Sequence, residues 1–129
     1  MTHTSPGFTI VESLVALAIL SIALVSFYEA GGRTLQASNH LEMVQNAALL
    51  ANSKLNEVAS NNSLLSPASS GLFPGTSYSW SIFARTLPTG ARSSGAARLQ
   101  DVTIIISWRE ALNQQSISID TRHLGSEPQ

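Results

Sequence analysis

The residue whose position has the greatest chemical consequence is Glu12, a carboxylate near the start of a long uncharged run. No charged residue lies between Glu12 and Glu29. With residues 8–11 included, about 21 residues could lie in a bilayer, since a helix rises about 1.5 Å per residue and the hydrocarbon layer is roughly 30 Å thick. A charge in that layer costs a few kcal/mol, so the Glu12 carboxylate needs a partner or a route to the interface.

The neighbours of Glu12 offer it one local role. Thr9-x-x-Glu12 matches a capping box, in which the hydroxyl and the acid satisfy backbone donors at the start of a helix. A cap of this kind stabilises a helix by about 1 kcal/mol. Capping therefore explains a glutamate at this place without any partner, and the sequence leaves a second role open beside it.

The other residues able to bind metals or transfer protons are scattered along the chain. They include His3, His40, His123, Asp101, Glu110 and Asp120. The histidines lack the spacing of metal ligands, and the acids match no calcium loop. No Ser-His-Asp order and no phosphate-binding glycine loop is present. We therefore expect no catalytic residue, no metal and no cofactor, and predict that the protein is not an enzyme.

Size and charge limit the remaining possibilities. The chain has 129 residues, a net charge of −1 and seven scattered Lys and Arg residues. Without a basic stripe, nucleic acid is not expected as a partner. The absence of cysteine removes disulfides, thiol catalysis and thiolate metal sites together. About a hundred residues remain outside the apolar run, enough for one small core.

The helical pattern continues beyond the apolar run. Apolar residues recur with a period near 3.6, which predicts one helix from Phe8 to about Ala59. The predicted stripe consists of Leu41, Val44, Ala48, Ala51, Leu55 and Val58. Lys54 and Glu57 are assigned to its solvated face. Gly31-Gly32 lies between the apolar and amphipathic halves, and two glycines cost about 2 kcal/mol of helix propensity. This pair is the expected place for a bend or an unwound turn.

The rest of the chain has the pattern of a small sheet. Residues 60–77 are rich in Ser, Pro and Gly and are predicted to form a surface loop, held to the domain by Leu72 and Phe73. Three runs alternate with period 2 and predict antiparallel strands, with Trp80, Phe83 and Trp108 assigned to the core. These runs are 78–85, 99–108 and 115–121, and residues 88–97 between the first two are predicted to form a loop. The expected fold class is α+β, with a long N-terminal helix packed on a small antiparallel sheet.

The segment Gly7-Phe8-Thr9-Ile10-Val11-Glu12, with the uncharged run after it, resembles the start of a type IV pilin-like protein. The resemblance implies that a prepilin peptidase cuts after Gly7 and N-methylates Phe8. Glu12 would then be the fifth residue of the mature chain. It would pair with the amine of mature Phe8 on a neighbouring subunit, since a low dielectric strengthens such an attraction. Glycine suits the position before the cut because it obstructs a protease least, although a turn at the helix entrance would also favour it.

Within this family the chain is most similar to the I-type minor pseudopilins of type II secretion. The segments Val15-Ala16-Leu17-Ala18-Ile19 and 47–55 carry that similarity. It implies a leader at 1–7, a transmembrane and assembly helix at 8–30, an amphipathic head helix at 31–60, and a loop and sheet at 61–129. The implied location is the inner membrane of a Gram-negative bacterium, with a single pass and a periplasmic head. The implied partners are the prepilin peptidase, the other minor pseudopilins and the major pseudopilin.

Two alternatives remain at the level of sequence. A minor type IV pilin that primes a pilus would share the N-terminal motif, and a signal-anchored periplasmic binding protein would share the apolar run. The leader departs from the family pattern because it contains no Lys or Arg. The proline found deep in the membrane helix of many major pilins is replaced by Glu29, which favours a minor subunit.

Overall fold

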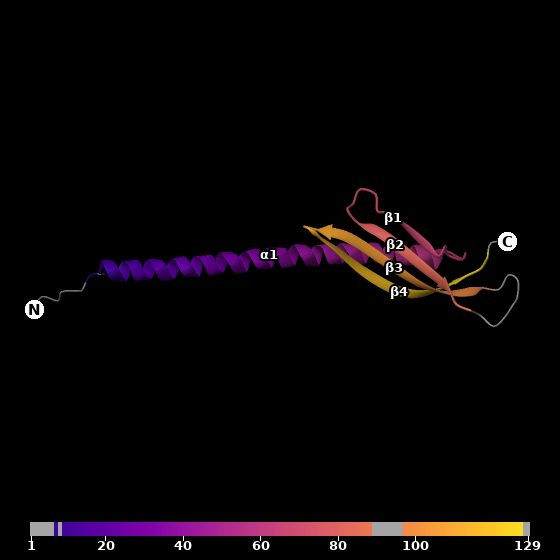
Figure 1. Ribbon diagram of the computed structural model, residues 1–129, viewed down its shortest axis with the longest axis horizontal. Coiled ribbons are helices and arrows are strands. Elements are labelled where there is room, and N and C mark those ends of the chain that lie inside the picture. The colour runs from indigo at the N-terminus through magenta and orange to yellow at the C-terminus, as the bar shows by residue number, and fades with distance from the viewer. Residues whose placement is uncertain (1–6, 8, 89–96, 128–129) are drawn as a thin grey trace, which may run out of the picture. The chain divides into compact units, whose positions relative to one another are not determined.

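The computed structural model describes residues 7, 9–88 and 97–127. They form one helix, α1 (Ile10–Ser60), and four strands: β1 (Ala68–Leu72), β2 (Ser79–Thr86), β3 (Arg98–Glu110) and β4 (Asn113–Gly125). The chain divides into two compact units, residues 1–39 and 40–129, and α1 contributes to both. Figure 1 shows the order of the elements. The predicted α+β class is confirmed.

The helix α1 is uninterrupted over its 51 residues. It therefore confirms the predicted long helix, although the helix begins at Ile10 and not at Phe8; Thr9 precedes it, and Phe8 lies outside the described residues. The expected unwinding at Gly31-Gly32 is wrong, because both glycines are helical. Helix growth is cooperative, and restarting a helix after a break would cost a new nucleus. The long helical segments on both sides offset the poor propensity of the glycine pair.

The four strands form one antiparallel sheet in the order β1-β2-β3-β4. The three predicted strands correspond to β2, β3 and β4. The strand β1 lies where a surface loop was predicted, and that part of the prediction is wrong. Four of its five residues are exposed, so its sequence lacks the apolar alternation that signals a strand. Backbone pairing with β2 forms it instead.

A close approach fixes the residue type at one position of β1. Gly71 pairs with Trp80 of β2, and a Cβ atom added to Gly71 would lie 2.8 Å from Cζ2 of that indole. Only glycine leaves room for the ring at this distance. The neighbouring Leu72 is 73% exposed, so its predicted role in holding this segment is wrong. Phe73 does pack against the core, as predicted.

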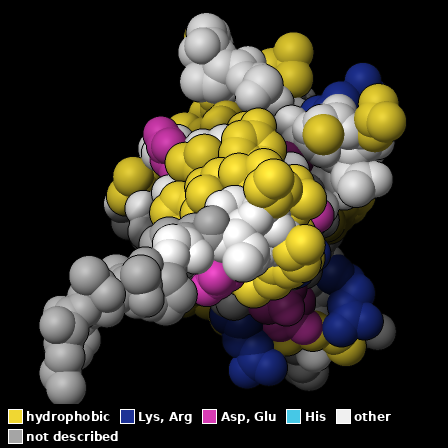
Figure 2. Space-filling view, turned by 90° about the vertical axis from the view of Figure 1, so that its left-hand side faces the viewer, with side chains coloured by type: hydrophobic (Ala, Val, Ile, Leu, Met, Phe, Trp, Pro, Cys, Tyr) yellow, Lys and Arg dark blue, Asp and Glu magenta, His cyan; other side chains and the backbone are white. Residues whose placement is uncertain are grey.

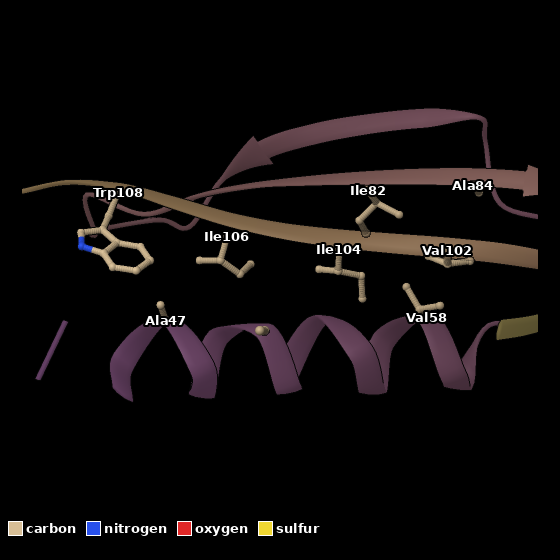
Figure 3. Packing of buried hydrophobic residues seen from close by; sticks show 9 residues of the cluster. Ala47, Val58, Ile82, Ala84, Val102, Ile104, Ile106 and Trp108 are labelled. Carbon is tan, nitrogen blue, oxygen red and sulfur yellow. The ribbon is translucent and has the colours of Figure 1, made fainter. Parts of the chain in front are cut away.

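The core lies between α1 and the sheet (Figure 3). Its buried members are Ala47, Ala51 and Val58 of α1, Ile82 and Ala84 of β2, and Val102, Ile104, Ile106 and Trp108 of β3. The alternation predicted for β3 is confirmed, since its even-numbered residues from Val102 to Trp108 are buried and the intervening ones are not. Phe83 was assigned to the core, yet it is 49% exposed. Its register with Thr103 places it on the sheet face away from α1.

The buried face of α1 is rotated relative to the predicted stripe. Leu41 and Ala48 are exposed, whereas Ala47 is fully buried. Figure 3 shows Ala47 below Trp108, a position that favours the smallest side chain able to pack there. Lys54 is a second correction, because its side chain is only 13% exposed and its Nζ lies 4.1 Å from the centroid of the Trp80 ring. A lysine stem can cover an aromatic face while its ammonium stays partly solvated.

The end of α1 is tied to the end of β4. The backbone N–H of Ser126 donates to the carbonyl of Asn62 at 2.9 Å, and the N–H of Leu64 donates to the carbonyl of Ser126 at 3.1 Å. The ring of His123 is buried, and its Nε2 donates to the carbonyl of Ser63 at 3.0 Å. A Cβ atom at Gly125 would lie 2.7 Å from that same carbonyl oxygen. These contacts fix the direction in which α1 crosses the sheet.

Candidate processing and assembly segment

The start of α1 is defined by a threonine cap. The backbone N–H of Glu12 donates to Oγ1 of Thr9 at 3.2 Å, and the N–H of Ser13 donates to the carbonyl of Thr9 at 3.1 Å. Thr9 is therefore the N-cap, and the threonine half of the predicted capping box is confirmed. The cap satisfies one of the backbone donors that the first turn of any helix leaves unpaired.

Glu12 occupies the first turn of α1, and its side chain is exposed. A carboxylate in this turn is favoured by the positive end of the helix dipole. Glu12 enters none of the ion pairs formed among residues 9–88 and 97–127. The Glu12 carboxylate therefore lies at the N-terminal end of an apolar helix, where it can accept hydrogen bonds from a group outside this chain.

Gly7 lies before the helix and is exposed, and an added Cβ atom would meet nothing within 4 Å. Packing within the described chain therefore does not explain a glycine at this place. Phe8, the other residue of the predicted cleavage site, lies outside the described residues, as do residues 1–6 of the predicted leader.

The surface of the first half of α1 is apolar all round. The large apolar side chains of α1 between Ile10 and Tyr28 are exposed, and no residue in the most hydrophobic stretch of the helix is buried. Figure 2 shows hydrophobic side chains gathered on the helix. Two hydroxyls in this half are satisfied within the helix, since Ser21 donates to the carbonyl of Leu17 at 2.8 Å and Ser26 to that of Ile22 at 2.9 Å. The helix is long and apolar enough to cross a membrane once.

The residues considered for metal or proton chemistry take part in separate contacts. His40 pairs through Nδ1 with Glu110 at 2.7 Å. Asp101 lies between two arginines of neighbouring strands, and Asp120 accepts a hydrogen bond from Thr103 at 2.7 Å. No group of three metal-ligating side chains occurs in the part of the chain that the structure describes.

The outer face of the sheet carries a hollow of about 570 Å³ that the sequence did not indicate. Its polar lining consists mainly of charges that already pair across strands: Arg85 with Asp101 at 3.4 Å and Arg122 with Asp101 at 3.2 Å. The strand register creates this row, and sequence spacing alone could not reveal it.

Comparison with known proteins agrees with this geometry. Residues 4–28 match the family described as the prokaryotic N-terminal methylation motif, so the capped apolar helix is the N-terminal segment of a type IV pilin-class protein. The whole chain is similar to type II secretion system protein I of Pseudomonas aeruginosa, with 32% identity over 95% of this chain and 96% of that protein. No solved structure matches.

The chain thus belongs to the type II secretion system protein I family. It is a pseudopilin, anchored in a membrane by the single apolar segment of α1. The resemblance noted on residues 7–20 and 47–55 is confirmed over nearly the full length.

Proposed function

We propose that this pseudopilin is processed between Gly7 and Phe8, methylated on the amine of Phe8, and assembled with other minor pseudopilins at the tip of a periplasmic pseudopilus. The observation that carries the proposal is the exposed Glu12 carboxylate in the first turn of a Thr9-capped apolar helix. The match of the methylation motif to residues 4–28 supports the same assignment. The tip complex would start the filament that moves folded proteins through the outer membrane.

The processing step depends on access to the backbone. Hydrolysis of the Gly7–Phe8 peptide bond would release the leader with a new carboxylate on Gly7 and leave a free amine on Phe8. A prepilin peptidase would then replace one hydrogen of that amine by a methyl group taken from a methyl donor. Gly7 is exposed, and a Cβ atom added to it would meet nothing within 4 Å. Because Gly7 precedes the helix, the bond to be cut lies outside α1.

The role of Glu12 in assembly follows from the amine that processing creates. The amine of Phe8 in a neighbouring subunit would be a cation close to the level of Glu12. Two charges about 4 Å apart attract by roughly 4 kcal/mol at an effective dielectric constant near 20, and by less in water. The pair would therefore select a fixed register between neighbouring helices. Capping by Thr9 uses the backbone of Glu12, so it leaves the carboxylate available for this contact.

The membrane and the filament would use the same apolar surface of α1. In the bilayer the surface faces lipid, and in a filament it would face the helices of other subunits. Small residues such as Ala16, Ala18 and Ala23 allow helices to approach closely. The head, residues 40–129, would project into the periplasm from the inner membrane.

The mature N-terminus tests the processing step. Intact mass of the chain purified from a strain with the peptidase should show loss of residues 1–7 and gain of one methyl group on Phe8. The same chain from a peptidase-deficient strain is the control and should keep its leader. An uncleaved chain in both strains would favour a signal-anchored binding protein and contradict the proposal.

Substitution of Glu12 tests assembly separately. Glu12→Ala should be cut and methylated normally but should fail to copurify with the other pseudopilins and should reduce secretion. Thr9→Ala is the matched control, because it removes the cap and keeps the carboxylate. Normal secretion by Glu12→Ala would contradict the pairing role. A Glu12→Ala defect in pilus formation, with secretion unaffected, would favour a minor type IV pilin.

A further inference from the structure

The strand β4 is a long edge of the sheet with an open outer side. It spans 13 residues, and in the part of the chain that the structure describes it pairs with no strand other than β3. Among the described residues, backbone contacts on its outer side occur only just past its end, where Ser126 meets Asn62 and Leu64. Natural edge strands are commonly protected by proline, by bulges or by charges that point inward. The segment 113–119 has no proline and no charge. This edge is therefore suited to pairing with another strand.

The hydrogen-bond pattern identifies which residues of β4 are open. The N–H of Leu87 donates to the carbonyl of Leu99 at 2.8 Å, so odd-numbered residues of β3 bond toward β2 and even-numbered ones toward β4. The two-residue turn Ala111-Leu112 agrees, because Glu110 and Asn113 close it. Odd-numbered residues of β4 therefore bond to β3, and even-numbered ones direct N–H and C=O outward. The outward-directed residues of β4 are Gln114, Ser116, Ser118, Asp120, Arg122 and Leu124.

The apolar stripe of α1 extends beyond the sheet on the same side. The flank of α1 toward β2 is identified by Lys54, which lies over Trp80, and by Met43, whose carbonyl accepts a hydrogen bond from Tyr78 at 3.1 Å. Helical periodicity turns the opposite flank toward β4. We call its apolar residues, with the two half-buried isoleucines of β4, the β4-side strip. The strip consists of Leu41, Val44, Ala48 and Leu55 of α1 with Ile117 and Ile119 of β4.

The β4-side strip is incompletely covered by the chain itself. Leu41 is 59% exposed and Ala48 is exposed, while Val44 and Leu55 are half-buried. No charged residue belongs to the strip. The helix thus offers apolar surface for one strand more than the described chain supplies, directly beside the open edge of β4. This width explains why the sequence pattern predicted Leu41 and Ala48 as buried residues.

The direction of β4 restricts which strand can pair with it. At one end of the head His40 meets Glu110, and at the other Val58 lies below Val102, so β3 runs opposite to α1 (Figure 3). The strand β4 therefore runs in the same direction as α1, away from the end at which the anchor joins. An antiparallel partner must run toward that end. The edge strand β1 of this fold runs in that direction.

We propose that the open edge of β4 pairs with the membrane-directed edge strand of a neighbouring pilin-like subunit, whose inward apolar side chains cover the β4-side strip. The proposal rests on the pseudopilin function, since that function places such a subunit in the same membrane with a parallel helix. A symmetric pair of two β4 strands is excluded as the occupant, because antiparallel β4 strands would direct the two α1 helices in opposite directions. The segment added by the neighbour is extended and has an apolar residue at every second position.

Photocrosslinking of the full chain tests this surface. A photoactivatable phenylalanine analogue replaces Ser118 at the open edge, and in a second strain it replaces Phe83, which is exposed on the inner strand β2. Each chain is expressed in bacterial membranes with the pseudopilins of the same secretion system. We expect an adduct from position 118 whose attachment site, located by mass spectrometry, lies in an edge strand of another pseudopilin. An adduct only from position 83, or one from position 118 to a second copy of this chain, would overturn the proposal.

Two pairs of variants measure the contribution of the edge and of the strip. Ser116→Pro removes an outward N–H without touching the β3 ladder, whereas Ser116→Ala keeps it. Loss of this bond should lower the adduct yield about fivefold, the equivalent of a typical hydrogen bond. Ala48→Glu places a charge in the strip and should lower the yield similarly, with Asn46→Glu on the other flank of α1 as its control. If trypsin sensitivity of the head shows that Ser116→Pro misfolds, the adduct yield of Ala48→Glu relative to Asn46→Glu tests the proposal instead.

The possible failures are distinguishable. Equal adduct yields for Ala48→Glu and Asn46→Glu would overturn the edge proposal. No adduct from a chain that is cleaved, methylated and active in secretion would also overturn it, while leaving the pseudopilin function intact. A chain that is neither cleaved nor able to support secretion would contradict the proposed function, and the edge proposal with it.

Discussion

At the scale of single residues, the first turn of α1 assigns helix capping and the proposed pairing with a neighbour to different groups. The sequence alone left both roles open for Glu12. Thr9 caps the helix through the backbone N–H of Glu12, whereas the Glu12 carboxylate is exposed. The cap stabilises the start of the helix locally, and the carboxylate is the group that we propose to act between subunits. A substitution at one position therefore need not affect the other function.

We predict that Thr9→Ala loosens the start of α1 without preventing assembly. Loss of an N-cap costs about 1 kcal/mol, which corresponds to a roughly fivefold larger population of the open first turn. Hydrogen exchange at the amides of Glu12 and Ser13 in detergent should accelerate by that factor, with Leu20 as an internal reference. Unchanged exchange at Glu12 would show that the cap contributes nothing.

Gly71 gives a second prediction at this scale. In Gly71→Ala the new Cβ atom would lie 2.8 Å from the Trp80 ring, so the ring or β1 must move. We expect a loss of about 1–3 kcal/mol in unfolding free energy, as for other overpacked sites. Ser70→Ala, one residue away and exposed, should change stability little. Denaturant unfolding followed by tryptophan fluorescence measures both variants.

At the scale of elements, α1 combines two surfaces on one unbroken helix. Its first half has no buried residue, and its second half packs on the sheet through Ala47, Ala51 and Val58. The pair Gly31-Gly32 lies within the helix and meets no side chain. Its effect is therefore on helix propensity and not on packing.

We predict that replacing both glycines by alanine stiffens α1 without altering the head. Two Gly→Ala changes add about 2 kcal/mol of helix propensity. Hydrogen exchange around residues 28–36 should slow by about tenfold or more, while the unfolding midpoint of the head stays unchanged. If secretion falls although the head is intact, a flexible point in α1 is part of assembly. Unchanged exchange would contradict the propensity argument.

At the scale of the whole molecule, the head is held by one layer of side chains between α1 and β2–β3. Ile104 is fully buried at its centre. The apolar side chains that β4 packs against this layer are the half-buried Ile117 and Ile119, and β4 forms one edge of the sheet. Stability and assembly are therefore expected to depend on different residues of the same head.

Ile104→Ala should destabilise the head by about 2–5 kcal/mol, because the surrounding atoms cannot fill the lost volume. Leu112→Ala at the β3–β4 turn is the control, since Leu112 is 98% exposed and should change stability by less than about 0.5 kcal/mol. Thermal unfolding of the full chain in detergent micelles compares the two. Similar effects at both positions would contradict the assignment of the core to this layer.

The sequence by itself determined the long helix, its apolar first half, the three alternating strands and the segment from Gly7 to Glu12. These features depend on composition and on periods of 3.6 and 2, which are local properties of the chain. The N-terminal motif could be recognised because a carboxylate inside an uncharged run is costly in a membrane, and is therefore rare there without a function.

Tertiary structure alone decided β1, the rotation of the buried face of α1 and the burial of Lys54. The strand β1 arises from backbone pairing with β2, and its own side chains give no signal. Ala47 replaces Ala48 in the core because the position of Trp108 on β3 determines which face of α1 is covered. Such contacts join residues far apart in the chain, so no local pattern contains them. For the same reason, only the sheet order reveals that the apolar stripe of α1 is wider than the sheet that covers it.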